Sequence, residues 1–207
     1  MKIIRNLTIA FALLITSAIS LAEIVEVYTW KAAPGKAAQM ISNFTRAKAL
    51  HEEAGASVSI VQRMTGSTQE INYIMRWDTP SAWGASMDAA NSDEMMTKWQ
   101  AFMAEASLDP SGEMVASVSG ANLDQSKKAA DFDGVTVYGA WVWKVAPGRT
   151  ADFVQSAMES KKIHESMGAR IEVYSENVGG TGNMHYVMIW DSYSDWADSK
   201  DKMASSA

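Results

Sequence analysis

Two histidines stand in the same short pattern, Lys-x-x-His-Glu, at two places in the chain. They are His51 and His164. A neutral imidazole can take up and release a proton near neutral pH, so each is a candidate general base or ligand-binding group. A cation near the end of a helix also complements the helix dipole, so a structural role fits the same pattern. We predict that His51 and His164 are the catalytic residues if the protein is an enzyme.

Aromatic residues recur at alternate positions in four candidate strands. Alternate residues of a strand share one face, so each set lines one side of a sheet. Such a face could line a ligand pocket, or it could be the ordinary core, because aromatic rings dominate core burial. The candidate ligand-binding residues are Tyr28, Trp30, Tyr73, Trp77, Trp141, Trp143, Tyr186 and Trp190.

The remaining histidine, His185, alternates with Tyr186 and is predicted to be structural. With three histidines and no cysteine, a metal site would need carboxylates to complete it. We therefore predict no metal site and no cofactor. The glycine-rich run at 179–182 lies between two candidate strands, which favours a hairpin turn over a phosphate-binding loop.

The sequence repeats with a shift of 113 residues. Residues 22–94 aligned with 135–207 give 22 identities in 73 pairs, or about 30%, without a gap. The repeated features include the turn Ala33-Pro34-Gly35, which matches Ala146-Pro147-Gly148. A period this long indicates a duplicated domain.

Each copy shows the same order of elements. In copy one, alternation predicts strands at 24–30, 57–63, 70–77 and 113–119. Apolar residues three or four apart predict a helix from Lys36 to Glu53. Thr79-Pro80 marks the start of a second helix, which we predict to run to about Ala106. The order is β-α-β-β-α-β, which is the ferredoxin-like unit.

The combination of a Pro-Gly turn, an amphipathic helix and a Trp-Asp strand end resembles the dimeric α+β barrel superfamily. The similarity is greatest to antibiotic-biosynthesis-monooxygenase-like and NIPSNAP-like domains, and it covers both copies. The resemblance implies an α+β fold in which two tandem ferredoxin-like units form an intramolecular barrel. It also implies a small-molecule site between a sheet and its helices.

The expected domains are a signal peptide at 1–22, unit one at 23–119, a polar exposed linker at 120–134 and unit two at 135–207. Residues 95–123 of copy one have no counterpart in copy two. We therefore expect the second unit to be truncated and to leave an open sheet edge, through which the chain could form a homo-oligomer.

The first 22 residues contain Lys2 and Arg5, then an apolar run that ends in Ser20-Leu21-Ala22. This pattern predicts a secretory signal peptide cleaved after Ala22, and hence a periplasmic or secreted protein that is not anchored in a membrane. The net charge of −6 and the absence of a dense basic patch argue against nucleic-acid binding.

These observations predict an exported protein that binds a small apolar molecule in an aromatic-lined pocket. One alternative is a cofactor-independent monooxygenase or isomerase, in which His51 or His164 moves a proton of an electron-rich substrate. Another is a structural or interaction module that pairs through the open edge of unit two.

Overall fold

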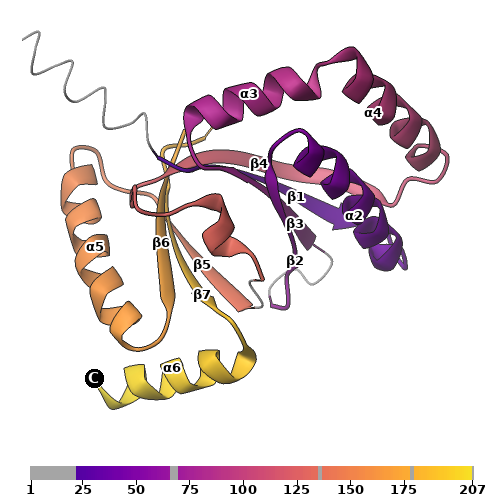
Figure 1. Cartoon of the computed structure of the whole chain (residues 1–207). Coiled ribbons are helices and arrows are strands. Elements are labelled where there is room, and N and C mark those ends of the chain that lie inside the picture. The colour runs from indigo at the N-terminus through magenta and orange to yellow at the C-terminus, as the bar shows by residue number, and fades with distance from the viewer. Residues whose placement is uncertain (1–21, 66–69, 135–136, 178–179, 207) are drawn as a thin grey trace, which may run out of the picture. The chain divides into compact units, whose positions relative to one another are not determined.

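The computed structural model describes residues 22–65, 70–134, 137–177 and 180–206 (Figure 1). The predicted signal peptide lies outside the described residues, except for Ala22. Across the described part of the chain, no helix has the length and apolar character needed to cross a membrane.

The chain divides into two compact units. Unit 1 extends to Ser117 and includes residues 127–129, and unit 2 comprises 118–126 and 130–207. The boundary between the units lies within strand β4 (Gly112–Asn122). The prediction that residues 120–134 form an exposed linker is therefore wrong. Residues 120–122 belong to β4, and Ala129–Phe132 forms a 3-10 helix whose Phe132 is buried.

Unit 1 has the predicted ferredoxin-like order. Strand β1 (Ile24–Ala32) is followed by helix α2 (Ala37–Glu53), strands β2 (Ser57–Gln62) and β3 (Glu70–Trp77), helices α3 (Pro80–Ala90) and α4 (Asp93–Ala106), and then β4. The strand order is β2-β3-β1-β4. Strand β3 pairs antiparallel with both β1 and β2, and Tyr73 lies between Tyr28 and Ile60.

The second helix of unit 1 differs from its prediction, because it is interrupted. Helix α3 ends at Ala90, and Ser92 then caps α4 by accepting a hydrogen bond from the backbone N–H of Met95 at 3.3 Å. A serine that accepts this bond favours a new helix start, so the chain changes direction between the two helices.

Unit 2 repeats the first five elements of this order. It contains β5 (Val137–Trp143), α5 (Thr150–Ser166), β6 (Arg170–Glu176), β7 (Met184–Trp190) and α6 (Tyr193–Ser205). Its strand order is β4-β6-β7-β5, with β7 antiparallel to both β6 and β5. Residues 120–122 of β4 pair with β6, and β5 stands at the end of the strand order.

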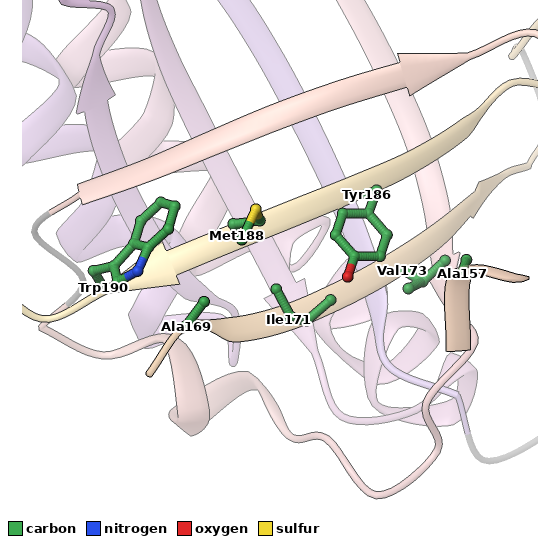
Figure 2. Close-up of a cluster of buried hydrophobic side chains, with 7 residues drawn as sticks. All are labelled: Ala157, Ala169, Ile171, Val173, Tyr186, Met188 and Trp190. Atoms are coloured by element: carbon green, nitrogen blue, oxygen red, sulfur yellow. The ribbon is translucent and has the colours of Figure 1, made fainter. Parts of the chain in front are cut away.

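The core of each unit lies between the sheet and its first helix. In unit 2, alternate residues of β6 and β7 point to the same side and meet Ala157 of α5 (Figure 2). The buried cluster consists of Ala157, Ala169, Ile171, Val173, Tyr186, Met188 and Trp190. Unit 1 has an equivalent cluster around Tyr73, Met75 and Trp77. Burying three large side chains of this kind contributes roughly 5–9 kcal/mol to folding.

Gly112 of β4 lies very close to the end of β1 and to helix α2. A Cβ atom at this position would lie 2.2 Å from the carbonyl oxygen of Lys31 and 2.3 Å from Cε of Met40. We expect Gly112→Ala to lower the free energy of unfolding by about 1–3 kcal/mol, because backbone as well as side chain must move. Urea denaturation followed by tryptophan fluorescence would measure this change.

Gly84 supplies the matched control. It lies inside α3, and a Cβ there would meet nothing within 4 Å. Gly84→Ala should therefore raise the stability of the helix by about 0.5–1 kcal/mol. Equal effects of the two substitutions would contradict the close approach at Gly112.

Candidate functional site

The two histidines of the repeated pattern make the same contact in both units. Nδ1 of His51 lies 2.7 Å from the phenol oxygen of Tyr73, and Nδ1 of His164 lies 2.7 Å from that of Tyr186. Each histidine comes from the last turn of the first helix, and each tyrosine comes from the central strand of the sheet. The structure thus joins predicted catalytic residues to predicted ligand-binding residues.

The lysine of the same pattern fixes the helix against the sheet. Nζ of Lys48 donates to the carbonyl oxygen of Val58 at 2.8 Å, and Nζ of Lys161 donates to that of Ile171 at 2.5 Å. Because lysine precedes histidine by three residues, both side chains leave the helix on the same side. The Lys-x-x-His pattern therefore places the imidazole above the central strand, a role that sequence reasoning did not assign to the lysine.

Burial keeps both members of each pair neutral at pH 7. It lowers the pKa of His51 from 6.5 to about 4, and burial together with the charge of Lys200 also lowers the pKa of His164. Burial likewise raises the pKa of Tyr73 and of Tyr186 above the usual value. If the phenol donates its proton to Nδ1, Nε2 carries the ring hydrogen and is a donor. If Nδ1–H donates to the phenol oxygen instead, Nε2 keeps its lone pair and is a base.

The surroundings of the two pairs differ. In unit 1 the ring of Trp99 lies against His51 with 4.6 Å between centroids, and Phe44 lies between Trp30 and Tyr73. In unit 2 the position equivalent to Phe44 is Ala157. The pair in unit 1 is therefore enclosed by aromatic rings, whereas the pair in unit 2 has a smaller neighbour.

The eight candidate aromatic residues fall into three groups. Tyr73, Trp77, Tyr186 and Trp190 are buried in the two cores, and Tyr28 and Trp30 pack against the core of unit 1. Trp141 and Trp143 on β5 remain 43% and 52% exposed. Close packing rather than a pocket thus surrounds the predicted residues of unit 1, because Phe44 and Trp99 fill the space beside them.

A cavity of about 240 Å³ lies in unit 2, between the end of β7 and helix α6. One end of it is formed by the turn that joins α5 to β6. Its lining residues are Met167, Gly168, Arg170, Ile189, Trp190, Asp191, Asp195, Asp198 and Lys202. The predicted pocket between sheet and helices was expected to be apolar and aromatic, but this cavity is lined largely by charged side chains.

Trp190 is the predicted binding residue that the cavity includes. Its side chain is only 2% exposed, and its indole N–H has no hydrogen-bond partner within the described structure. In Figure 2 the indole nitrogen lies on the side of the ring toward Ala169, whose neighbours Gly168 and Arg170 also line the cavity. The nitrogen itself has almost no accessible surface, so other atoms of Trp190 border the cavity.

Sequence reasoning missed the charged residues of the cavity. Asp195, Asp198 and Lys202 lie on α6, where the equivalent residues of copy one are Ala82, Ala85 and Ala89. The signal was present in the repeat: three alanines on one helix face in copy one become charged residues in copy two. Comparing where the copies differ, rather than where they agree, would have revealed it.

His185 occupies a separate hairpin. Its Nε2 lies 2.8 Å from Oε1 of Glu176, which also accepts hydrogen bonds from the turn residues Thr181 and Asn183. Burial would raise the pKa of Glu176, but these hydrogen bonds outweigh it and lower the pKa to about 2. Among the described residues, no group of three or more His, Asp or Glu side chains is arranged to hold a metal.

Comparison with known proteins identifies similar structures. A putative monooxygenase from Lactobacillus acidophilus NCFM has a TM-score of 0.56 and 9% identity, covering 86% of this chain and 81% of its own. A putative monooxygenase from Fusobacterium nucleatum subsp. nucleatum has a TM-score of 0.55 and 11% identity, covering 87% and 81%. A putative chlorite dismutase has a TM-score of 0.51 and 15% identity, covering 87% and 85%.

No family model matches the sequence, and no curated protein matches it. The structural similarities extend over both units and over most of each similar chain. At such low identity they show the fold and not the activity.

The burial of His51 predicts an unusual titration. By NMR, its imidazole should titrate near pH 4, and that of His164 should titrate below 6.5. Because the pKa of His51 is lower in the folded than in the unfolded chain, the unfolded chain binds more protons between about pH 4 and 6.5. The free energy of unfolding should therefore fall as the pH decreases through this window.

The variant His51→Gln should remove this part of the pH dependence, since glutamine does not titrate. Tyr73→Phe, which keeps the ring but removes the phenol oxygen, serves as a comparison for the hydrogen bond. A His51 that titrates at or above pH 6.5 in the folded protein would contradict the burial argument.

Proposed function

We propose that this chain, which has the fold of the dimeric α+β barrel superfamily, is an exported protein that binds a small molecule between the sheet and the helices of unit 2. Export rests on the predicted signal peptide at 1–22. The binding site is the cavity beside Trp190.

The observation that carries the proposal is the cavity itself, which is bordered by the ring of Trp190 and by charged side chains such as Asp198 and Lys202. The ring of Trp190 supplies apolar surface at the cavity wall, and Arg170, Asp198 and Lys202 supply polar groups. Ligand pockets commonly join such apolar surface to a few polar groups that fix the orientation of the ligand. The volume of about 240 Å³ suits a molecule of metabolite size.

Native mass spectrometry of the mature protein, purified from its own host, tests the proposal. We expect the natural protein to retain a small molecule. We expect the variant Trp190→Phe to lose this molecule or to bind it with clearly reduced occupancy. Phenylalanine keeps an aromatic ring in the core but is smaller than tryptophan, so the reduction reports on the part of the indole ring that borders the cavity.

Trp77→Phe in unit 1 is the matched control. Trp77 holds the equivalent strand position, is 1% exposed, and lies in the packed core of unit 1 rather than at the wall of the cavity. Thermal unfolding of both variants would show that each remains folded. Equal retention of the ligand by Trp190→Phe and the natural protein would contradict a site beside Trp190.

A second candidate function is a cofactor-independent monooxygenase or isomerase. The repeated His–Tyr pair favours it, and two structurally similar proteins are described as putative monooxygenases. For His164 to act as a base, its Nδ1–H must donate to the phenol oxygen of Tyr186, which leaves a lone pair on Nε2. The neighbouring tryptophans Trp141 and Trp143 would offer an aromatic surface to an electron-rich substrate.

Substitution of the histidines tests this candidate. Once a substrate is known from the retained molecule, His164→Ala should reduce turnover by at least about 100-fold, because a positioned general base contributes on this scale. Activity should rise with pH as His164 loses its proton. Turnover that survives in the double variant His51→Ala/His164→Ala would exclude histidine catalysis.

A third candidate is an interaction module in which copies of the chain pair through unit 2. Strand β5 stands at the end of the strand order, and residues 140–143 are exposed. An exposed strand edge can pair with another chain. Sedimentation of the mature protein should then show a dimer or a larger assembly, and a strictly monomeric protein would contradict edge pairing.

A further inference from the structure

We infer that unit 2 presents a docking face for an amphipathic helix of a partner protein, and that this helix carries an aromatic residue followed, about two turns later, by a basic one. The docking face is the side of α5 that includes Glu159, Ile163 and His164. None of these three residues lines the cavity beside Trp190, so the inference goes beyond the proposed function.

Unit 1 shows what covers the equivalent side of its own first helix. There α4 lies against α2, and the rings of Trp99 and His51 are 4.6 Å apart between centroids. Nη2 of Arg46 lies 2.6 Å from Oε2 of Glu105, and the same guanidinium lies over the ring of Phe102. Helix α4 therefore meets α2 through aromatic contacts and through one ion pair.

Unit 2 keeps this side of the helix but leaves it uncovered. Among the described residues of unit 2, no helix follows α6, which matches α3 in the repeat. His164 matches His51, and Ile163 matches Leu50. Ile163 is 55% exposed, whereas Leu50 is half-buried. The side chains that α4 covers in unit 1 thus have exposed equivalents in unit 2.

A tryptophan adds apolar surface beside α5. The ring of Trp143, which is exposed, lies 6.3 Å from that of Phe153 on α5. Its equivalent in unit 1, Trp30, is half-buried and packs against Phe44. Apolar surface that one copy covers and the other exposes indicates where a partner docks.

The charge on the docking face identifies the chemistry of the partner. Glu159 stands where unit 1 has Arg46, so the sign is reversed. Glu159 is exposed and accepts a hydrogen bond from the neutral side chain of Gln155 at 3.0 Å. Because α4 presents Glu105 to Arg46, a helix that binds unit 2 should present lysine or arginine to Glu159.

The spacing of the contacts fits a helix. Trp99 and Glu105 are six residues apart, which is about 9 Å along α4, and the residues they meet on α2 are five apart, which is roughly 7.5 Å. His164 and Glu159 have that same spacing of five on α5. The exposed carboxylate and the net charge of −6 disfavour an anionic membrane surface as the occupant.

Binding of a synthetic peptide to the mature protein tests the inference. The probe has the sequence of residues 92–107, which form α4 and its two caps, with the change Glu105→Lys. A lactam bridge between positions 97 and 101, both exposed in α4, holds it helical, because a free helix of this length is marginal in water. Its lysine would meet Arg46 in unit 1, so binding there is disfavoured.

Fluorescence anisotropy of the labelled probe gives the affinity. We expect saturable binding below about 1 mM. A probe that also carries Trp99→Ala should bind at least about tenfold more weakly, because aromatic anchors dominate such interfaces. Absence of binding up to about 1 mM would overturn the inference.

Reversing the charge on the protein should reverse the preference between peptides. We expect the natural protein to bind the Glu105→Lys probe about fivefold more tightly than the bridged peptide of unchanged sequence, and the variant Glu159→Arg to prefer the unchanged peptide. Asp201→Arg, the same charge change at an exposed position of α6, is the control and should keep the natural preference. Circular dichroism would show that both variants fold. The same preference in Glu159→Arg as in the natural protein would contradict the docking face.

A second copy of the chain is the rival occupant of this face. Sedimentation of the mature protein would then show a dimer that Ile163→Asp converts to a monomer, and the probe would not bind the natural protein. That outcome would replace the partner helix by self-association. Retention of a small molecule beside Trp190 is measured separately and does not depend on either result.

Discussion

Both units depend on burying one face of a central strand beneath a helix. In β3 and in β7 the alternating residues Tyr, Met and Trp point toward the first helix, and these side chains form the centre of each core. The lysine of the helix then bonds to a carbonyl of the neighbouring strand, and the histidine one turn later meets the tyrosine. Once that face is buried, the position of the His–Tyr pair follows from the spacing of the helix.

The two units use this shared arrangement differently. In unit 1, Phe44 and Trp99 lie against the His–Tyr pair, and α3 carries Ala82, Ala85 and Ala89. In unit 2, Ala157 replaces the phenylalanine and charged residues replace the alanines. The two copies therefore share one backbone arrangement and differ in the side chains at equivalent positions.

The cavity and the His–Tyr pair of unit 2 lie along the same strand, β7. Trp190 at its end borders the cavity, and Tyr186, four residues earlier, holds His164. Lys200 of α6 lies over the rings of both Trp190 and Trp141, at 5.4 and 5.7 Å, and its charge contributes to the low pKa of His164. One charge on α6 therefore lies against Trp190 and also lowers the pKa of His164.

The sequence alone determined the duplication, the α+β class and the order of elements, because alternation and helical spacing are local patterns that both copies repeat. It also placed His51, His164 and the aromatic strand faces correctly within the elements. The sequence did not indicate that Phe44 and Trp99 close the face in unit 1, that β4 extends into unit 2, or that the cavity is lined by Asp198 and Lys202. Those outcomes depend on which side chains fill the space between a helix and a sheet, and only the tertiary structure decides that packing.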